Sequence, residues 1–330
     1  MVVRPLYLRD STKMADDQLS DVFDVIAVRG LVSGGFAAAG DWVARFDVEF
    51  PLKLAAVVCG SVRLSTDGAD GADESVLLEP GDVAILNGRS RLVLEGGPGD
   101  GPPRELVVRE ADPFVRFDGA DCRAADVIVG GHIDLNAAGE AMLVGALPPL
   151  GHVRASAASG LRSSLDRLVD EVTNDRIGSA FAIRQYGQLL VLDVLRAYVD
   201  QADLPAGWLR VLTDERLRPA VSRMHGEPGR AWRLDELAHA AAMSRTSFAQ
   251  RFRAVAGVPP LTYLNSWRML LAQRALRDGD ARVGRLAAEL GYSSESAFSN
   301  AFKREVGLSP LRYRTRIRDG SSAAKGSIPP

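Results

Sequence analysis

The sequence predicts a two-domain α+β protein, in which a β-rich first part leads through two helices into an all-α second part. Three observations predict this fold. Apolar and polar residues alternate with period two between about residues 20 and 150, the period becomes helical between about 161 and 202, and one pattern occurs twice in the last third. A length of 330 residues is enough for about two domains.

The first part begins with residues 1–18, which are polar and are expected to form a mobile N-terminus. Short alternating runs follow, of which Trp42 to Phe50 is the clearest. Connectors rich in Gly, Asp and Pro separate them, as at 67–73 and 96–103. Many short strands at this spacing predict a sandwich or a small barrel over residues 19–153.

Residues 154–203 are predicted to form a helical connector. Its first helix carries one apolar stripe, made of Leu161, Leu165, Leu168, Val169 and Val172. A second and more apolar helix is expected at 181–199. Its apolar surface is wide enough for burial on two sides, either within one subunit or against a second one, and we favour a homodimer contact. The segment 203–207, Asp-Leu-Pro-Ala-Gly, is the expected interdomain linker.

The pattern in the last third recurs at a shift of 49 to 50 residues. The first copy contains Leu237, Ala238, Ser244, Phe248, Phe252, Gly257 and Pro260; the second contains Leu286, Ala287, Ser294, Phe298, Phe302, Gly307 and Pro310. The serine suits a helix N-cap, the glycine a helix end and the proline the start of the next helix. Each copy therefore predicts a helix-turn-helix unit, and the second has one extra residue in its turn.

The paired phenylalanines of each copy are expected to point into the core, so the residues between them face outward. Residues 260–278 join the copies and predict a helix roughly 28 Å long at about 1.5 Å per residue. That length is close to the roughly 34 Å between successive major grooves on one face of B-DNA. The spacing fits one chain that places two helices in neighbouring groove segments of double-stranded DNA.

The charge is divided unevenly along the chain. Residues 209–330 carry 21 Arg and Lys against 11 Asp and Glu, although the whole chain has a net charge of −2. A basic second part joined to an acidic first part is expected when one end of the protein meets phosphate groups.

At these residues the chain resembles the AraC/XylS family of bacterial transcription regulators. The segment 288–314 is similar to the signature segment of the family, and 243–253 is similar to the first helix-turn-helix unit. The resemblance covers about 209–316. It implies an AraC-type DNA-binding domain over 209–318, with two recognition helices that read a bipartite site.

The resemblance also implies which side chains meet DNA. The base-reading positions fall on Thr246, Ala249 and Gln250 in the first helix and on Glu295, Ser296 and Asn300 in the second. Amides suit adenine and a carboxylate suits cytosine, whereas Ala249 can only contact a thymine methyl. The basic residues better placed for phosphates are Arg245, Arg251, Arg253, Lys303 and Arg304. The alternative for any single one of these side chains is contact with backbone or water alone. Ala249 is one departure from the family, because its side chain forms no hydrogen bond. Arg233 is another, because it stands where a Ser or Thr cap is common.

Residues 78–86, Leu-Glu-Pro-Gly-Asp-Val-Ala-Ile-Leu, resemble the turn and strand of a cupin. The resemblance implies a cupin-like sensor barrel over 19–153. Catalytic cupins hold a metal with His residues, but Ala55 and Leu92 occupy the expected positions and Asn87 replaces a usual Pro. We therefore expect no catalytic residue, no bound metal and no cofactor. Among the four histidines, His132 is expected near a pocket, in a structural role.

Taken together, the expectation is a cytoplasmic, sequence-specific transcription regulator, either activator or repressor. Its barrel would bind a small-molecule effector at residues that the sequence leaves unknown, and RNA polymerase is a further candidate partner. One alternative is a barrel that serves only dimerisation, and another is a metal-dependent enzyme fused to a DNA-binding domain. No apolar run approaches the roughly 18 residues of a membrane span, so no membrane contact is expected.

Two smaller expectations concern the C-terminal segment and the cysteines. Residues 319–330, rich in Ser, Ala, Gly and Pro, are expected to form a disordered tail. The cysteines, Cys59 and Cys122, lack metal-ligand spacing and are expected to be buried or inert thiols.

Overall fold

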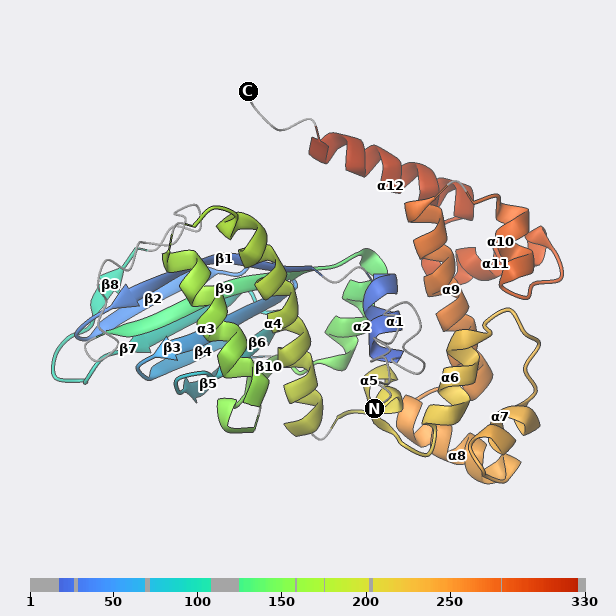
Figure 1. Cartoon of the computed structure of the whole chain (residues 1–330), viewed down its shortest axis with the longest axis horizontal. Helices are drawn as coiled ribbons and strands as arrows, with labels where there is room; N and C mark the ends of the chain where they lie inside the picture. The colour runs from blue at the N-terminus through green and yellow to red at the C-terminus, as the bar shows by residue number, and fades with distance from the viewer. Residues whose placement is uncertain are drawn as a thin grey trace, which may run out of the picture. The chain divides into compact units, whose positions relative to one another are not determined.

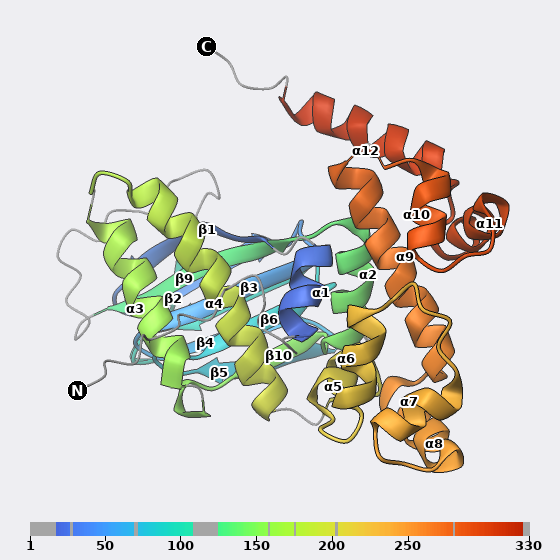
Figure 2. The same cartoon turned by 45° about the vertical axis from the view of Figure 1, so that its right-hand side comes forward.

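The computed structural model describes residues 18–26, 29–68, 72–107, 125–157, 159–174, 176–201, 204–279 and 281–325. They form two compact units, called here the β unit (27–205) and the helical unit, which joins the chain up to Ile26 to residues from Ala206 onward. Figures 1 and 2 show the strands with helices α2–α4 in one unit and helices α1 and α5–α12 in the other. The expected combination of a sheet-rich part and a helical part is confirmed.

The β unit contains two five-stranded sheets in the part of the chain described. Sheet A has the order β1-β9-β3-β6-β10 and sheet B the order β5-β4-β7-β2-β8. The strands are β1 (Arg29–Ala38), β2 (Trp42–Asp47), β3 (Leu52–Cys59), β4 (Val62–Asp67), β5 (Asp73–Leu78), β6 (Val83–Asn87), β7 (Arg91–Gly96), β8 (Arg104–Leu106), β9 (Asp126–Asp134) and β10 (Leu150–Val153). The pairs are antiparallel except β2 with β8.

The core of the β unit is apolar and includes the two positions at which a catalytic cupin would carry histidines. Ala55 on β3 and Leu92 on β7 are each 2% exposed and pack in the same cluster as Trp42. The Trp42 indole N–H donates to Asp126 at 2.8 Å, which satisfies the polar atom of this buried ring. Among the described residues, no group of three or more His, Cys, Asp or Glu is placed to hold a metal ion.

Two further expectations concern side chains of the β unit. His132 on β9 stacks on Phe50, with ring centroids 3.7 Å apart. Cys59, which ends β3, is buried as expected, but it is disulfide-bonded, so the expectation of a thiol is wrong for this residue. Cys122 lies outside the described residues.

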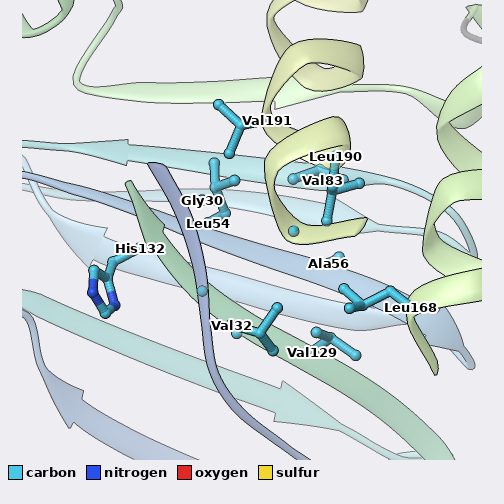
Figure 3. Close-up of a pocket in the computed structure, with 13 residues that line it drawn as sticks. Gly30, Val32, Leu54, Ala56, Val83, Val129, His132, Leu168, Leu190 and Val191 are labelled. Atoms are coloured by element: carbon cyan, nitrogen blue, oxygen red, sulfur yellow. The ribbon is translucent and has the colours of Figure 1, made fainter. Parts of the chain in front are cut away.

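Helices α3 (Ser159–Thr173) and α4 (Ser179–Gln201) lie in the segment expected to be helical, and α4 packs against β1 and β10 of sheet A. A Cβ atom on Gly30 of β1 would lie closer than 3.0 Å to the backbone of Gly187 in α4, so only glycine fits this contact. Figure 3 shows the space beside it, whose volume of about 20 Å³ is roughly that needed for one water molecule. Side chains thus fill this interface almost completely.

Helix α2, strand β10 and the turn η2 lie between β9 and α3 in the chain. Helix α2 (Ala137–Ala146) follows β9, and Asn136 caps it by accepting from the backbone N–H of Gly139 at 2.8 Å. The 3-10 turn η2 (Ala155–Ala157) follows β10. Asn87, at the position of a usual cupin Pro, donates to the carbonyl oxygens of Val144 and Leu147 and so holds the end of α2 on β6.

The helical unit begins with helix α1 (Gln18–Ile26), which packs on α6 and α9. The expected boundary at residue 19 assigned this segment to the barrel. Its residues Val22, Val25 and Ile26 instead follow a helical spacing and are buried in the helical unit. Gln18 donates to the carbonyl of Arg218 at 3.2 Å, which ties the start of α1 to α6.

The other helices of this unit are α5 (Trp208–Thr213), α6 (Arg218–Gly226), α7 (Leu234–Ala240), α8 (Arg245–Ala256), α9 (Pro260–Asp278), α10 (Val283–Glu289), α11 (Glu295–Val306) and α12 (Pro310–Lys325). Residues 319–325, expected in a disordered tail, instead continue α12, which ends at Lys325. Residues 326–330 and the expected mobile segment 1–17 lie outside the described residues. Within the described part of the chain, no helix is both long and apolar enough to cross a membrane.

Candidate nucleic-acid interface

The two predicted helix-turn-helix units are present and share their capping geometry. Ser244 accepts from the backbone N–H of Ser247 at 3.2 Å, and Ser294 accepts from that of Ala297 at 3.1 Å. These bonds satisfy N–H groups that the first turns of α8 and α11 would otherwise leave unpaired. Both helices end on a glycine in the left-handed region, with φ of 75° and 81°.

The cores of the two units also match. The ring centroids of Phe248 and Phe252 are 5.7 Å apart, and those of Phe298 and Phe302 are 5.8 Å apart. Each second phenylalanine meets the edge of a tyrosine on the following helix, which is Tyr263 in the first unit and Tyr313 in the second. All four phenylalanines are fully buried, so the expected inward face is confirmed.

The turn shows where the second unit gains its extra residue. The backbone N–H of Met243 donates to Ala238, and that of Tyr292 donates to Ala287, both at 2.9 Å. The repeat therefore keeps a shift of 49 through Tyr292, and the extra residue is Ser293. One residue earlier, both turns adopt positive φ, which is 50° at Ala242 and 78° at Gly291.

The structure places the base-reading candidates on α8 and α11, on the side away from the phenylalanines. The side chains of Thr246, Gln250, Glu295, Ser296 and Asn300 are exposed, and Ala249 is half-buried. The outward positions thus carry hydroxyl and amide groups, which can donate to and accept from base edges, and the Glu295 carboxylate, which can accept.

The basic candidates divide into two groups. The first group is exposed and consists of Arg245, Arg253, Lys303 and Arg304. Arg251 differs, because its guanidinium binds the nearly buried carboxylate of Asp214 with N–O distances of 2.7 and 3.2 Å. Asp214 also accepts from the backbone N–H of Leu217, so Arg251 holds the corner between α5 and α6 against α8.

The unusual cap residue Arg233 is compensated by a neighbouring carboxylate. Glu236 accepts from the backbone N–H of Arg233 and from the guanidinium of Arg230, both at 2.8 Å. These two hydrogen bonds lower the pKa of Glu236. The helix start therefore keeps one half of a capping box without a Ser or Thr.

The two helix-turn-helix units touch at a contact, called here the joint, that the sequence did not predict. Arg268 of α9 donates to the carbonyls of Pro228 at 2.6 Å and of Arg230 at 2.9 Å, and so holds the loop before α7. A Cβ atom on Gly229 or on Gly291 would lie closer than 3.0 Å to the backbone of the other segment. The loop of the first unit thus rests directly on the turn of the second. The Pro-Gly pair was the one available signal of this joint.

The first unit also buries a histidine. His225 of α6 stacks on Trp267 at 3.9 Å, and its Nε2 lies 3.0 Å from the Tyr263 hydroxyl. Burial disfavours the charged imidazolium and lowers the pKa of His225 to about 4. The ring is therefore neutral at pH 7 and acts as part of the core.

Comparisons with known proteins match both units. A family model described as Cupin matches residues 17–200, and one described as Helix-turn-helix domain matches 237–316. The chain is 34% identical over 305 residues to an AraC-like transcription regulator of Streptomyces lividans, which covers 90% of this chain and 98% of that protein. It is 27% identical over 314 residues to the HTH-type transcriptional regulator AlkR of Acinetobacter baylyi, covering 90% and 99%.

Proposed function

Because the chain belongs to the AraC-like transcription regulators and is a DNA-binding regulator of that family, we propose that it reads a bipartite DNA site with α8 and α11. The observation that carries this proposal is the pair of matching units, each with a capped helix and exposed polar side chains. In this arrangement Gln250 and Asn300 contact adenine, Glu295 contacts cytosine, and Thr246 and Ser296 add shorter contacts. The half-buried Ala249 contributes at most a methyl contact.

Phosphate contacts are assigned to the exposed cations Arg245, Arg253, Lys303 and Arg304. Arg251, also a candidate from the sequence, supports the site through Asp214 in the free protein. To contact a phosphate, Arg251 would have to share its guanidinium with Asp214 or release that carboxylate.

In-vitro selection of DNA sites with the full chain, at a stated near-physiological salt concentration, tests the bipartite proposal. The expected result is two enriched motifs about one helical turn apart. Gln250→Ala should alter the base preference in one motif and Asn300→Ala in the other, each with an affinity loss of about tenfold. Salt-sensitive binding without any enriched sequence would show phosphate contact alone and would contradict the proposal.

We propose in addition that the protein is a homodimer through α4. Ile177, just before this helix, is fully exposed, while Phe181 and Leu189 are 62% and 50% exposed at spacings of four and eight residues. These side chains form an apolar stripe on the face of α4 that does not pack on sheet A. Phe181→Arg with Leu189→Glu should yield monomers in analytical ultracentrifugation, whereas Arg63→Glu with Glu95→Arg, at exposed paired positions of sheet B, should not.

The β unit is proposed to act in the cytoplasm as the binding module for a small-molecule effector, rather than as an enzyme. The support is the apolar packing of Ala55 and Leu92 where cupin metal ligands would stand. A barrel that only dimerises predicts that no small molecule raises the melting temperature of the protein or changes its DNA affinity. Contact with RNA polymerase is a further proposal, which in-vitro transcription from a selected site would test.

A further inference from the structure

A cleft of about 680 Å³ opens in the β unit, which carries none of the residues assigned to DNA. Strand β5 lines one side and strand β10 another, and these are edge strands of sheets B and A. The first turn of α3 and the turn before β6 complete the lining. Its volume lies within the range of roughly 300–1,000 Å³ that is usual for small-molecule sites.

The floor of the cleft is held rigidly by Asp82. Its carboxylate lies 2.7 Å from Nε2 of His152 on β10, and it accepts from the backbone N–H groups of Ala155 at 2.9 Å and Glu79 at 3.2 Å. Gly81, with φ of 92°, allows this turn to approach η2, because a Cβ atom there would lie 2.7 Å from that of Ala155. The site is therefore preorganised before any ligand enters.

The charges that a ligand would meet are mainly positive. The side chains of Arg154 and Arg162 line the cleft and are exposed, and neither forms an ion pair with another described residue. Asp82 is buried and already satisfied by three donors. Glu79 is the remaining exposed carboxylate of the lining. The exposed charges of the cleft are therefore two guanidinium groups and one carboxylate.

The other surface of the cleft is apolar. Val76 and Leu77 of β5 and Pro80 of the following turn contribute it, and Leu77 is 49% exposed. A large apolar side chain so exposed beside two arginines suits a ligand with an apolar body and an anionic end.

We propose that this cleft binds a small organic anion, whose carboxylate or phosphate group pairs with Arg154 and Arg162 while its apolar body covers Leu77. The ligand class follows from the cleft alone. Its role as the effector of transcription rests on the proposed function of the β unit.

Thermal-shift and calorimetric titrations of the full chain test the proposal with phenylacetate, hexanoate and phenyl phosphate. Their neutral controls are phenylacetamide, hexanamide and benzyl alcohol. At least one anion should raise the melting temperature and its neutral control should not. Arg154→Gln and Arg162→Gln should each weaken that anion about tenfold. Arg104→Gln, at an exposed arginine of β8 on the opposite edge of sheet B from β5, is the matched control and should leave affinity unchanged.

Three results would overturn the proposal: no stabilisation by any of the anions, equal stabilisation by the neutral controls, or anion binding that survives both arginine substitutions. Leu77→Ala provides a second variant that keeps all charges, and it should weaken hexanoate more than phenyl phosphate. If an anion binds through the arginines but DNA affinity stays constant, the cleft assignment stands and the effector role fails.

Discussion

The two helix-turn-helix units have the same framework but different outward surfaces. Their caps, phenylalanine pairs and terminal glycines agree in position and geometry. Position by position, however, Arg245 corresponds to Glu295 and Arg251 to Ala301. Folding constrains the buried and capping residues, whereas the exposed residues are free to differ. The two recognition helices are therefore expected to read different base sequences.

The largest effect on stability is expected in the turn of the second helix-turn-helix unit. Gly291 has positive φ and touches the backbone of Gly229, so Gly291→Ala adds both strain and a clash. We expect a loss of about 4 kcal/mol in the free energy of unfolding. Chemical denaturation of the full chain measures it, with Gly145→Ala in α2, where a Cβ has open space, as the control. A loss below about 1 kcal/mol would contradict the described joint.

Acid should destabilise the first helix-turn-helix unit more than the second, because none of the four histidines of the sequence lies in the second. The pKa of His225 is lowered from 6.5 to about 4, so the unfolded chain takes up a proton more readily than the folded one. Stability is full above about pH 6.5 and declines as pH falls towards 4, by up to about 3 kcal/mol. Hydrogen exchange resolved by segment should show α6 and α9 loosening before α11. His225→Phe should remove this dependence.

Arg268 tests whether the units act as one rigid reader. Arg268→Ala removes both hydrogen bonds to the loop before α7 and should cost about 2 kcal/mol of stability. Preference for one spacing between the two DNA motifs should also weaken, as measured with sites that carry one added or deleted base pair. Arg274→Ala on the same helix, whose weak partner is Asp278 at 3.8 Å, should change neither quantity. Unchanged spacing preference in Arg268→Ala would show that α9 alone sets the geometry.

The smallest effect is expected at the counterpart of Gly291 in the first unit. Ala242 holds φ of 50°, which costs energy for any residue with a Cβ atom, and its side chain is exposed. Ala242→Gly should therefore stabilise the protein by up to about 1 kcal/mol, seen as a higher melting temperature. A decrease would mean that the entropy lost by glycine outweighs the relief of strain.

The sequence predicted the helix-turn-helix framework almost completely, because caps, glycine stops and buried phenylalanines are local signals. It also predicted the apolar filling at Ala55 and Leu92. It could not predict that Asp214 binds Arg251, or that Gly229 meets Gly291, because both contacts join segments distant in the chain. Helix α1 was assigned to the β unit for a related reason. Its period is visible in Val22, Val25 and Ile26, but the partner of that face is a property of the tertiary fold.

The packing of α1 makes the β unit an insertion within the helical unit. The chain leaves α1 at Ile26, begins β1 at Arg29 and returns to the helical unit only at Ala206. During synthesis, α1 therefore emerges first but must wait for α6 and α9 before its apolar face is covered. A truncated chain that starts at Ala206 would lack α1 and would leave α6 and α9 with an uncovered apolar surface. A complete helical unit therefore consists of two separate segments of the sequence, and isolating it requires the removal of the β unit from between them.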